Sequence, residues 1–335
     1  MLSRRTWQHT LHIHDSALAA TTRDNYRRAL TRYKEWADAE RVPKHMQLPI
    51  REQVVCAFAA SFAGVYSAGA ARSAIAGLKY YHEKKGWRWP SSARLSRILA
   101  AVRLHAPATS QRAPRPPVTL AMLDEALLHL DLNRGFDLCV ATTMLVVFWG
   151  QMRLGEALPT TRAYDFSSMP AVKHAKLRAD AGGDLSQETT AIWLPRTKTA
   201  RTGDWVWLAR HHNDPSYALH RHFRANRLAP NDPLFAYRHD RTDEVTPLTK
   251  RAFMARLNEI WVAAGMQRVS GHCFRIGSTT ALLRAGVAPE VVKMAGRWRS
   301  DAFLRYWRSI DAIISQHADL CEVTWKGHDS EVPPF

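Results

Sequence analysis

Two segments near the end of the sequence carry residue types that could act together on a phosphate ester. His272 and Arg275 stand three apart in a predicted helix that begins after Gly271, so both side chains should leave one face of it. Main-chain amides at a helix start also favour phosphate oxygens. Tyr306 follows a second helical stretch, 289–297, and could return to that face. A phenol attacks poorly at neutral pH unless cations stabilise the phenolate, and arginines flank Tyr306 in the sequence. The two segments together therefore predict phosphoryl transfer.

Cleaving a phosphodiester also requires positive charge on the non-bridging oxygens and a proton donor for the leaving oxygen. Arg153 lies where an apolar helix gives way to a turn, and Glu156 could hold it one helical turn later. Lys198 lies at the turn of a predicted hairpin, where a flexible ammonium can reach out and donate a proton, and Arg201 is a nearby competitor. Each residue also has a plain structural interpretation, such as a buried Arg–Glu pair or a charged hairpin tip. Taken one at a time, the motifs do not decide between the structural and the catalytic interpretation.

The order of these motifs resembles the tyrosine recombinases, also called the phage integrase family. The run Gly150-x-x-Arg153-x-Gly155-Glu156 is similar to the family's first arginine box, Lys198 to its hairpin lysine, and His272-x-x-Arg275 to its second box. Residues 296–306 are most similar to the integrases of Cryptons and DIRS-like retroelements. The resemblance covers nearly the entire chain.

The resemblance implies a site-specific DNA recombinase or integrase of a mobile element that works through a 3′-phosphotyrosine intermediate without metal, ATP or cofactor. The implied catalytic residues are Arg153 and Arg275 on the non-bridging oxygens, Lys198 as proton donor, His272 on the tyrosine proton, Trp298 as hydrogen-bond donor and Tyr306 as nucleophile. Glu156 and Arg297 would support them. Type IB topoisomerases and telomere resolvases share this chemistry, and a catalytically inactive, domesticated DNA-binding protein would keep the fold. These stay as alternatives.

Two positions depart from the family pattern. Most members place His or Trp nine residues before the nucleophile, where this chain has Arg297, and Trp298 is eight residues before it. Trp298 is the favoured candidate because an indole N–H can donate a hydrogen bond to a phosphate oxygen, but the choice between the two stays open. The residue after the second-box arginine, normally His, is Ile276.

Apolar periodicity and turn residues predict a mainly α-helical chain with a small antiparallel β-sheet. The predicted helices of the first third span 21–39, 52–65, 70–85 and 91–104. Residues 106–118 contain four prolines and two arginines and predict an extended linker. The predicted elements beyond it are helices over 120–132, 136–150, 216–227, 248–264, 273–285 and 289–295, and a β-hairpin over 190–209.

The resemblance divides the chain further. It implies a helical, SAM-like core-binding domain over residues 1–105 and an α+β catalytic domain over 119–310. The tail, 311–335, has an apolar spacing with which it could dock on a neighbouring protomer or pack against its own domain.

The charge of the chain favours a polyanionic partner. Its 335 residues carry a formal net charge of +17, and residues 1–110 hold 18 Lys and Arg against 7 Asp and Glu. The predicted DNA contacts are Arg72, Lys79, Arg94, Arg97, Arg112, Arg115 and Arg201. A solvated basic face would look the same. The resemblance implies double-stranded DNA with inverted-repeat arms, bound by a homo-oligomer that is a dimer on one site and a tetramer in synapsis.

Several other classes of protein and site are disfavoured. There is no run of 18 apolar residues and no signal peptide, so we expect an intracellular protein that acts with DNA, in a nucleus if eukaryotic and in the cytoplasm or nucleoid if bacterial. The four cysteines are widely spaced, which argues against a disulfide framework or a thiolate zinc site and predicts reduced core residues. We find no ATPase-type Gly-rich loop, no His-Glu-x-x-His and no carboxylate cluster, so no metal site is expected.

Overall fold

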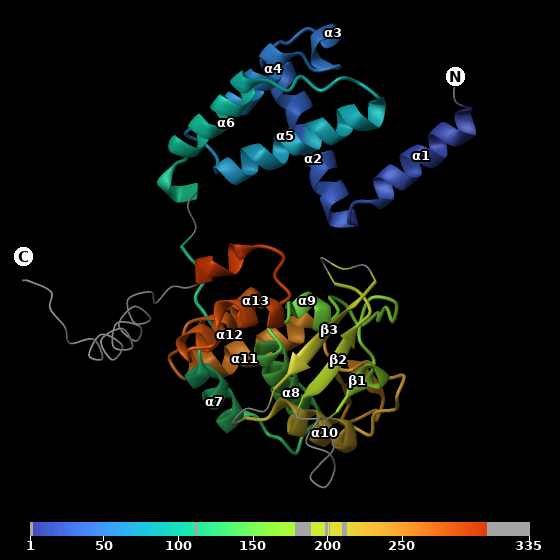
Figure 1. The fold of residues 1–335 in the computed structure, drawn as a ribbon, viewed down its shortest axis with the longest axis vertical. Helices are drawn as coiled ribbons and strands as arrows, with labels where there is room; N and C mark the ends of the chain where they lie inside the picture. The colour runs from blue at the N-terminus through green and yellow to red at the C-terminus, as the bar shows by residue number, and fades with distance from the viewer. Residues whose placement is uncertain are drawn as a thin grey trace, which may run out of the picture. The chain divides into compact units, whose positions relative to one another are not determined.

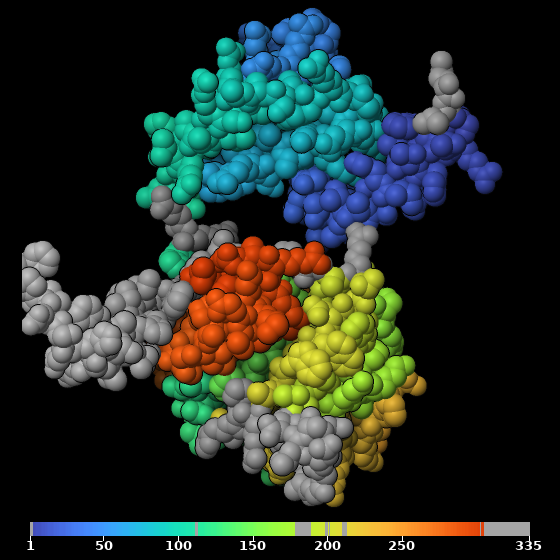
Figure 2. Space-filling model, in the orientation of Figure 1, coloured from blue at the N-terminus to red at the C-terminus, as the bar shows by residue number. Residues whose placement is uncertain are grey.

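The computed structural model describes residues 3–110, 113–177, 189–197, 200, 202–209 and 213–306, apart from the side chains of residues 302, 305 and 306. Its contacts divide the chain into two compact units, Met1–Pro114 and Arg115–Phe335 (Figure 1, Figure 2). Each unit has a hydrophobic core of its own. The predicted fold class, mainly helical with a small antiparallel sheet, is confirmed.

The first unit is built from helices. They are α1 (Arg4–Ser16), α2 (Ala20–Ala39), α3 (Lys44–Gln47), α4 (Glu52–Ala60), α5 (Ala68–Lys85) and α6 (Ala93–Leu104). The four predicted helices correspond to α2, α4, α5 and α6, although α4 ends earlier than predicted. Gly77 lets α5 approach α2 closely, since a Cβ there would lie 2.8 Å from the Cβ of Ala29. The rings of Tyr33, Phe58 and Phe62 lie in the core between these helices.

Helix α1 is not predicted by the sequence analysis, and none of its residues is buried. The Ser3 side chain caps its first turn by accepting a hydrogen bond from the main chain of Thr6. Its last turn is held by polar contacts: Asp15 accepts a hydrogen bond from Tyr80 Oη at 2.5 Å and pairs with Lys84 Nζ at 2.5 Å. A helix held in this way lacks the buried stripe on which helix prediction depends.

The second unit packs its helices around α8 (Gly135–Trp149), which is almost wholly buried, as the sequence predicts. The other α-helices are α7 (Leu120–His129), α9 (Leu154–Ala157), α10 (Pro215–Ala225), α11 (Lys250–Ala263), α12 (His272–Arg284) and α13 (Pro289–Ala295). Its short 3-10 helices are η2 (Val172–His174) and η4 (Asp301–Tyr306), and a further one, η1 (Ala108–Ser110), lies near the end of the first unit. Thr119, Asp214 and Thr249 cap α7, α10 and α11 by accepting main-chain N–H groups.

Two small antiparallel sheets complete the second unit. The strands β1 (Ala175–Lys176), β2 (Thr190–Leu194) and β3 (Asp204–Leu208) pair in the order β1-β2-β3, so the predicted hairpin is confirmed. The strands β4 (Ala236–Arg238) and β5 (Val245–Pro247) form a second, two-stranded sheet that the sequence analysis missed. At three residues a strand, β4 and β5 are too short to show an alternating pattern.

Val118, the last residue of the predicted linker, packs into the second unit. Its main-chain N–H donates to the carbonyl of Cys273 at 3.0 Å, and its side chain is 1% exposed. Gly277 in α12 makes this possible, because a Cβ at that position would collide with the Val118 carbonyl. The chain is thereby fastened to the helix that carries the second arginine box.

Other expectations concern cysteines, metals and membranes. Cys56, Cys139 and Cys273 are buried and form no disulfide, and Cys321 lies outside the described residues. Among residues that the structure describes, no group of three His, Cys, Asp or Glu side chains could hold a metal ion. No helix within the described ranges is long and apolar enough to cross a membrane.

Candidate active site

The first arginine box forms a tight turn between α8 and α9. Gly150 ends α8, Gln151 has a left-handed φ of 45°, and Arg153 is the N-cap of α9. A side chain at position 150 would lie 2.6 Å from Val206 Cγ1, so glycine is required where the turn meets β3. This turn exposes its main-chain carbonyls to the segments packed beside it.

Glu156 joins Arg153 of this turn to Arg297. Its Oε1 accepts from Arg153 Nη1 at 2.7 Å, and its Oε2 accepts from the main-chain N–H of Arg153 at 3.1 Å and from Arg297 Nη2 at 3.0 Å. The Glu156 side chain is 5% exposed. Burial alone would raise the pKa of Glu156, but Arg297 and Arg153 together hold it below the ordinary value. The carboxylate is therefore kept ionised.

Arg297 is fixed in place by two contacts. Besides the ion pair with Glu156, its Nη1 donates to the carbonyl of Gly150 at 3.3 Å. Its side chain is 6% exposed, and its φ of 55° turns the chain from α13 into the following residues. Arg297 thus acts as a brace between the first arginine box and the end of α13.

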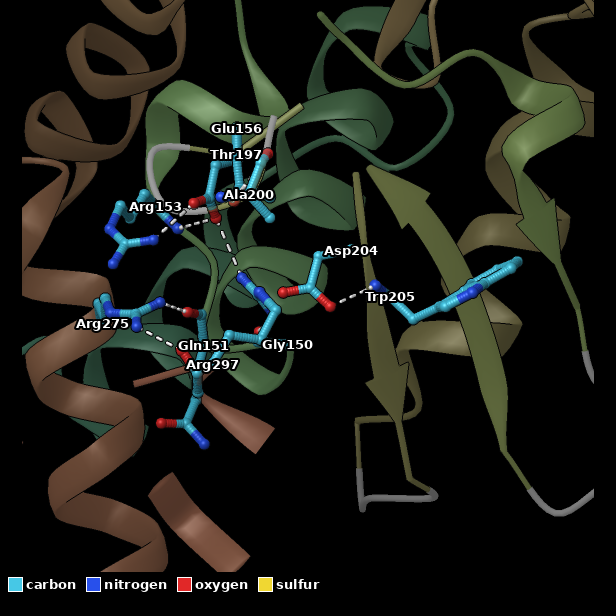
Figure 3. Close-up of polar contacts among 11 residues, drawn as sticks. Gly150, Gln151, Arg153, Glu156, Thr197, Ala200, Asp204, Trp205, Arg275 and Arg297 are labelled. Atoms are coloured by element: carbon cyan, nitrogen blue, oxygen red, sulfur yellow. Dashed lines mark hydrogen bonds and ion pairs between the residues drawn. The ribbon is translucent and has the colours of Figure 1, made fainter. Parts of the chain in front are cut away.

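Arg275 is entirely buried in α12. Its Nη1 donates to the carbonyl of Gln151 and its Nη2 to that of Gly296, and the ring of Trp298 covers the guanidinium at 4.0 Å. The two carbonyls fix the plane of the group. Arg275 and Arg297 are therefore both bonded to the turn that carries Arg153, as Figure 3 shows.

The cluster brings three guanidinium groups together with one carboxylate, and Glu156 pairs with two of them, those of Arg153 and Arg297. Arg153 is its most accessible member, with 24% of its side chain exposed. A cluster of guanidinium groups in a partly buried place favours an anion, and a phosphate fits the donor geometry of arginine.

Gln151 was not singled out in the sequence analysis. Its side-chain Oε1 accepts from Thr279 Oγ1 at 3.0 Å, its Nε2 donates to the carbonyl of Val292 at 3.3 Å, and its own carbonyl holds Arg275. It is fully buried and ties α8 to α12 and α13. Only its position inside the arginine box could have signalled this role.

His272 is the first residue of α12 and is half-buried. The residue before it, Gly271, packs so closely on α9 that a Cβ would lie 2.5 Å from Leu154 Cδ2. The start of the second arginine box is therefore pressed against the residue that follows Arg153. Packing between α9 and α12 brings the two boxes together.

Several predicted site residues fall outside what the structure describes. These are Lys198, Arg201 and Arg112, the tail 311–335, and the side chain of Tyr306, whose main chain ends η4. The residues on either side of the predicted hairpin tip are described: Thr197 and Ala200 bond to each other, N–H to carbonyl at 2.8 Å (Figure 3).

The other predicted DNA contacts are at the surface. Arg72, Lys79, Arg94, Arg97 and Arg115 are all exposed, and Lys79 Nζ lies 3.8 Å from Glu83 Oε1. Exposure is compatible with DNA binding and equally with a solvated basic face, so these assignments stay predictions.

The sequence matches no protein-family model and no curated protein. The structure of the Tn1549 transposon integrase in complex with transposon right end DNA is similar over 95% of this chain and 98% of that chain, with a TM-score of 0.56 and 13% identity. The chain has the tyrosine recombinase fold. The XerH site-specific recombinase bound to palindromic difH substrate, in a post-cleavage complex, matches 83% of this chain and 73% of that one, with a TM-score of 0.52 and 17% identity. At such identities the tyrosine recombinase fold is what the likeness establishes.

Proposed function

We propose that the protein is a site-specific DNA recombinase or integrase. It binds its target as a homo-oligomer, which is a dimer on one site and a tetramer in synapsis. The observation that carries the proposal is the convergence of Arg153, Arg275 and Arg297 on one turn. The tyrosine recombinase fold and the basic sequence support it. Double-stranded DNA with inverted-repeat arms is the proposed substrate, and a mobile element its proposed source.

In the proposed reaction Arg153 and Arg275 hold the non-bridging oxygens of the scissile phosphate. The Tyr306 oxygen attacks phosphorus and loses its proton towards His272, while Trp298 donates a hydrogen bond to the phosphate. The bond to the 5′-oxygen breaks and Lys198 protonates that oxygen. The product is a 3′-phosphotyrosine and a free 5′-hydroxyl. Because one phosphoester replaces another, attack by a second 5′-hydroxyl can rejoin the strand without ATP.

The burial of Arg275 adds a requirement to this reaction. Its guanidinium is entirely covered, in part by the Trp298 ring. A phosphate can reach it only after a covering group moves. In the proposed function, DNA binding supplies that movement, and the phosphate then pairs with the guanidinium.

Replacing the nucleophile tests the proposal. A labelled duplex selected from a random library by the wild-type protein should give adducts that survive denaturing electrophoresis, and Tyr306→Phe should abolish them while leaving equilibrium binding of that duplex unchanged. Tyr217→Phe, at an exposed tyrosine of α10, is the matched control and should form adducts normally. Adducts that persist in Tyr306→Phe would place the nucleophile elsewhere, and their absence from the wild type would favour an inactive DNA-binding protein.

Adduct formation is shared with type IB topoisomerases and telomere resolvases, so a second measurement is needed. If the cut strand is joined to a second duplex carrying a free 5′-hydroxyl, the protein is a recombinase. If the strand is only resealed or closed on itself, one of those two classes describes it better.

A further inference from the structure

The three-stranded sheet has one face in the core and one face outside it. Ile192 and Val206 are paired across β2 and β3, and both are completely buried. Because side chains alternate along a strand, their neighbours in sequence point to the opposite face. The outer face is therefore the face of the sheet that is available to a ligand.

Three tryptophans gather on this outer face, which we call the indole face: Trp193, Trp205 and Trp207. Trp193 and Trp205 are direct cross-strand partners with ring centroids 5.2 Å apart, and Trp205 and Trp207 lie 6.0 Å apart. Trp207 is 57% exposed. Large apolar rings are seldom left in water together, and a patch of them marks an interaction site.

The indole face packs closely on the main chain at one end and carries a cation. Gly203, with φ of 92°, lets Trp193 lie against the main chain, because any Cβ there would collide with the indole. Lys176 lies in the same cross-strand row as Trp207, and its Nζ is 5.0 Å from the centre of the Trp205 ring. The ring of Trp205 points away from the guanidinium cluster in Figure 3. The indole face is thus a separate surface on the strands that lead to the hairpin tip.

We propose that the indole face binds an unpaired nucleotide of the target DNA, with the base stacked on Trp207 and the phosphate paired with Lys176. A base offers two flat faces to an indole only when it has left the duplex, since stacked neighbours cover them in the helix. A cation beside exposed rings matches a nucleotide, which joins a flat base to an anion. A protein segment that bound the indoles through apolar contacts alone would not need the charge of Lys176.

This inference rests on the proposed function for the origin of the nucleotide. Exchanging strands requires bases next to the cut to leave one partner before they pair with another. The strands β2 and β3 run directly into the segment that carries Lys198, the proposed proton donor at the cut. The indole face therefore lies on the same hairpin as the proposed chemistry, where it can hold a base that is transiently without a partner.

Binding of a bulged duplex tests the inference without any cleavage. The full-length protein is titrated, at one fixed salt concentration, into a labelled short duplex and into the same duplex with one extra unpaired thymine. Wild type should bind the bulged duplex about 10-fold more tightly, as expected for one stacked base. Trp207→Ala should remove this preference and Trp207→Phe should keep most of it. Tyr217→Ala, which removes an exposed ring from α10, should keep it in full.

Three results would overturn the inference. Wild type could bind both probes equally, or Trp207→Ala could weaken both probes by the same factor. Trp207→Ala could also leave the preference intact while changing the oligomeric state in sedimentation, which would make the indole face a protein interface. Failure of the proposed function looks different: the Trp207-dependent preference would persist in a protein that never forms covalent adducts.

Discussion

Glu156 is the residue that allows two arginines to approach each other in the second unit. It is 5% exposed and pairs with Arg153 at 2.7 Å and with Arg297 at 3.0 Å. Without its charge the buried Arg297 would face another cation with, among the described residues, the Gly150 carbonyl as its remaining hydrogen-bond partner. Burying an uncompensated charge is among the most costly changes a folded protein can suffer.

Glu156→Gln should therefore lower the free energy of unfolding of the second unit by about 3 kcal/mol at neutral pH. Urea unfolding followed by circular dichroism measures it. Because the folded pKa of Glu156 is depressed, its contribution is fully present above the ordinary pKa of 4.5 and is lost as pH falls through the folded value. The gap between wild type and variant should thus shrink in acid. A gap that is constant with pH would show that the amide harms packing and not the ion pairs.

At the scale of elements, α12 is the centre of the site. It carries His272 and Arg275, its start presses on α9 through Gly271, and its middle receives the linker end through Gly277. The helix can approach both neighbours because glycines stand where α9 and the linker come closest. The packing of α12 thus supports a role in positioning the site residues, and this evidence does not depend on the proposed chemistry.

Gly277→Ala should destabilise the second unit by about 2 kcal/mol, because the added methyl group meets the main chain of Val118 and cannot be relieved by a rotamer change. Thermal unfolding checks this. Gly69→Ala in α5 is the matched control, since the nearest atom to its Cβ is 3.8 Å away and alanine favours a helix. If both variants had the same stability as wild type, the close approach at Val118 would be of no energetic importance.

At the scale of the whole molecule, charge governs the proposed interaction with DNA. The net charge of +17 is concentrated in the first 110 residues, where Arg94 and Arg97 stand exposed on α6. Release of counterions from DNA makes such binding strongly dependent on salt. The helices of the first unit should supply much of the affinity.

Replacing Arg94 and Arg97 together by alanine should reduce the slope of log affinity against log salt by about 2, at roughly 0.9 per lost phosphate contact. The measurement is duplex binding across a salt series. Arg134→Ala, at an exposed arginine paired with Asp240 at 2.8 Å, is the control and should leave the slope unchanged. An unchanged slope in the double variant would show that this face of α6 is merely solvated.

The sequence by itself determined the fold class, the longer helices of both units except α1, the hairpin and the order of the motifs. Periodicity, caps and turn residues are local, so they can be read without knowing what packs against them. Helix α1, the β4–β5 sheet and the role of Gln151 escaped because they depend on polar anchoring, on very short strands and on contacts between distant segments.

Only the tertiary structure decided what Arg297 and Trp298 touch. Arg297 is occupied by Glu156 and the Gly150 carbonyl, 141 and 147 residues away, whereas Trp298 covers Arg275. The two adjacent candidates thus have different contacts: Arg297 braces the first arginine box, and Trp298 packs on the second-box arginine. No local pattern encodes that choice, because it follows from how α8, α12 and α13 pack and from which carbonyls their ends leave to be satisfied.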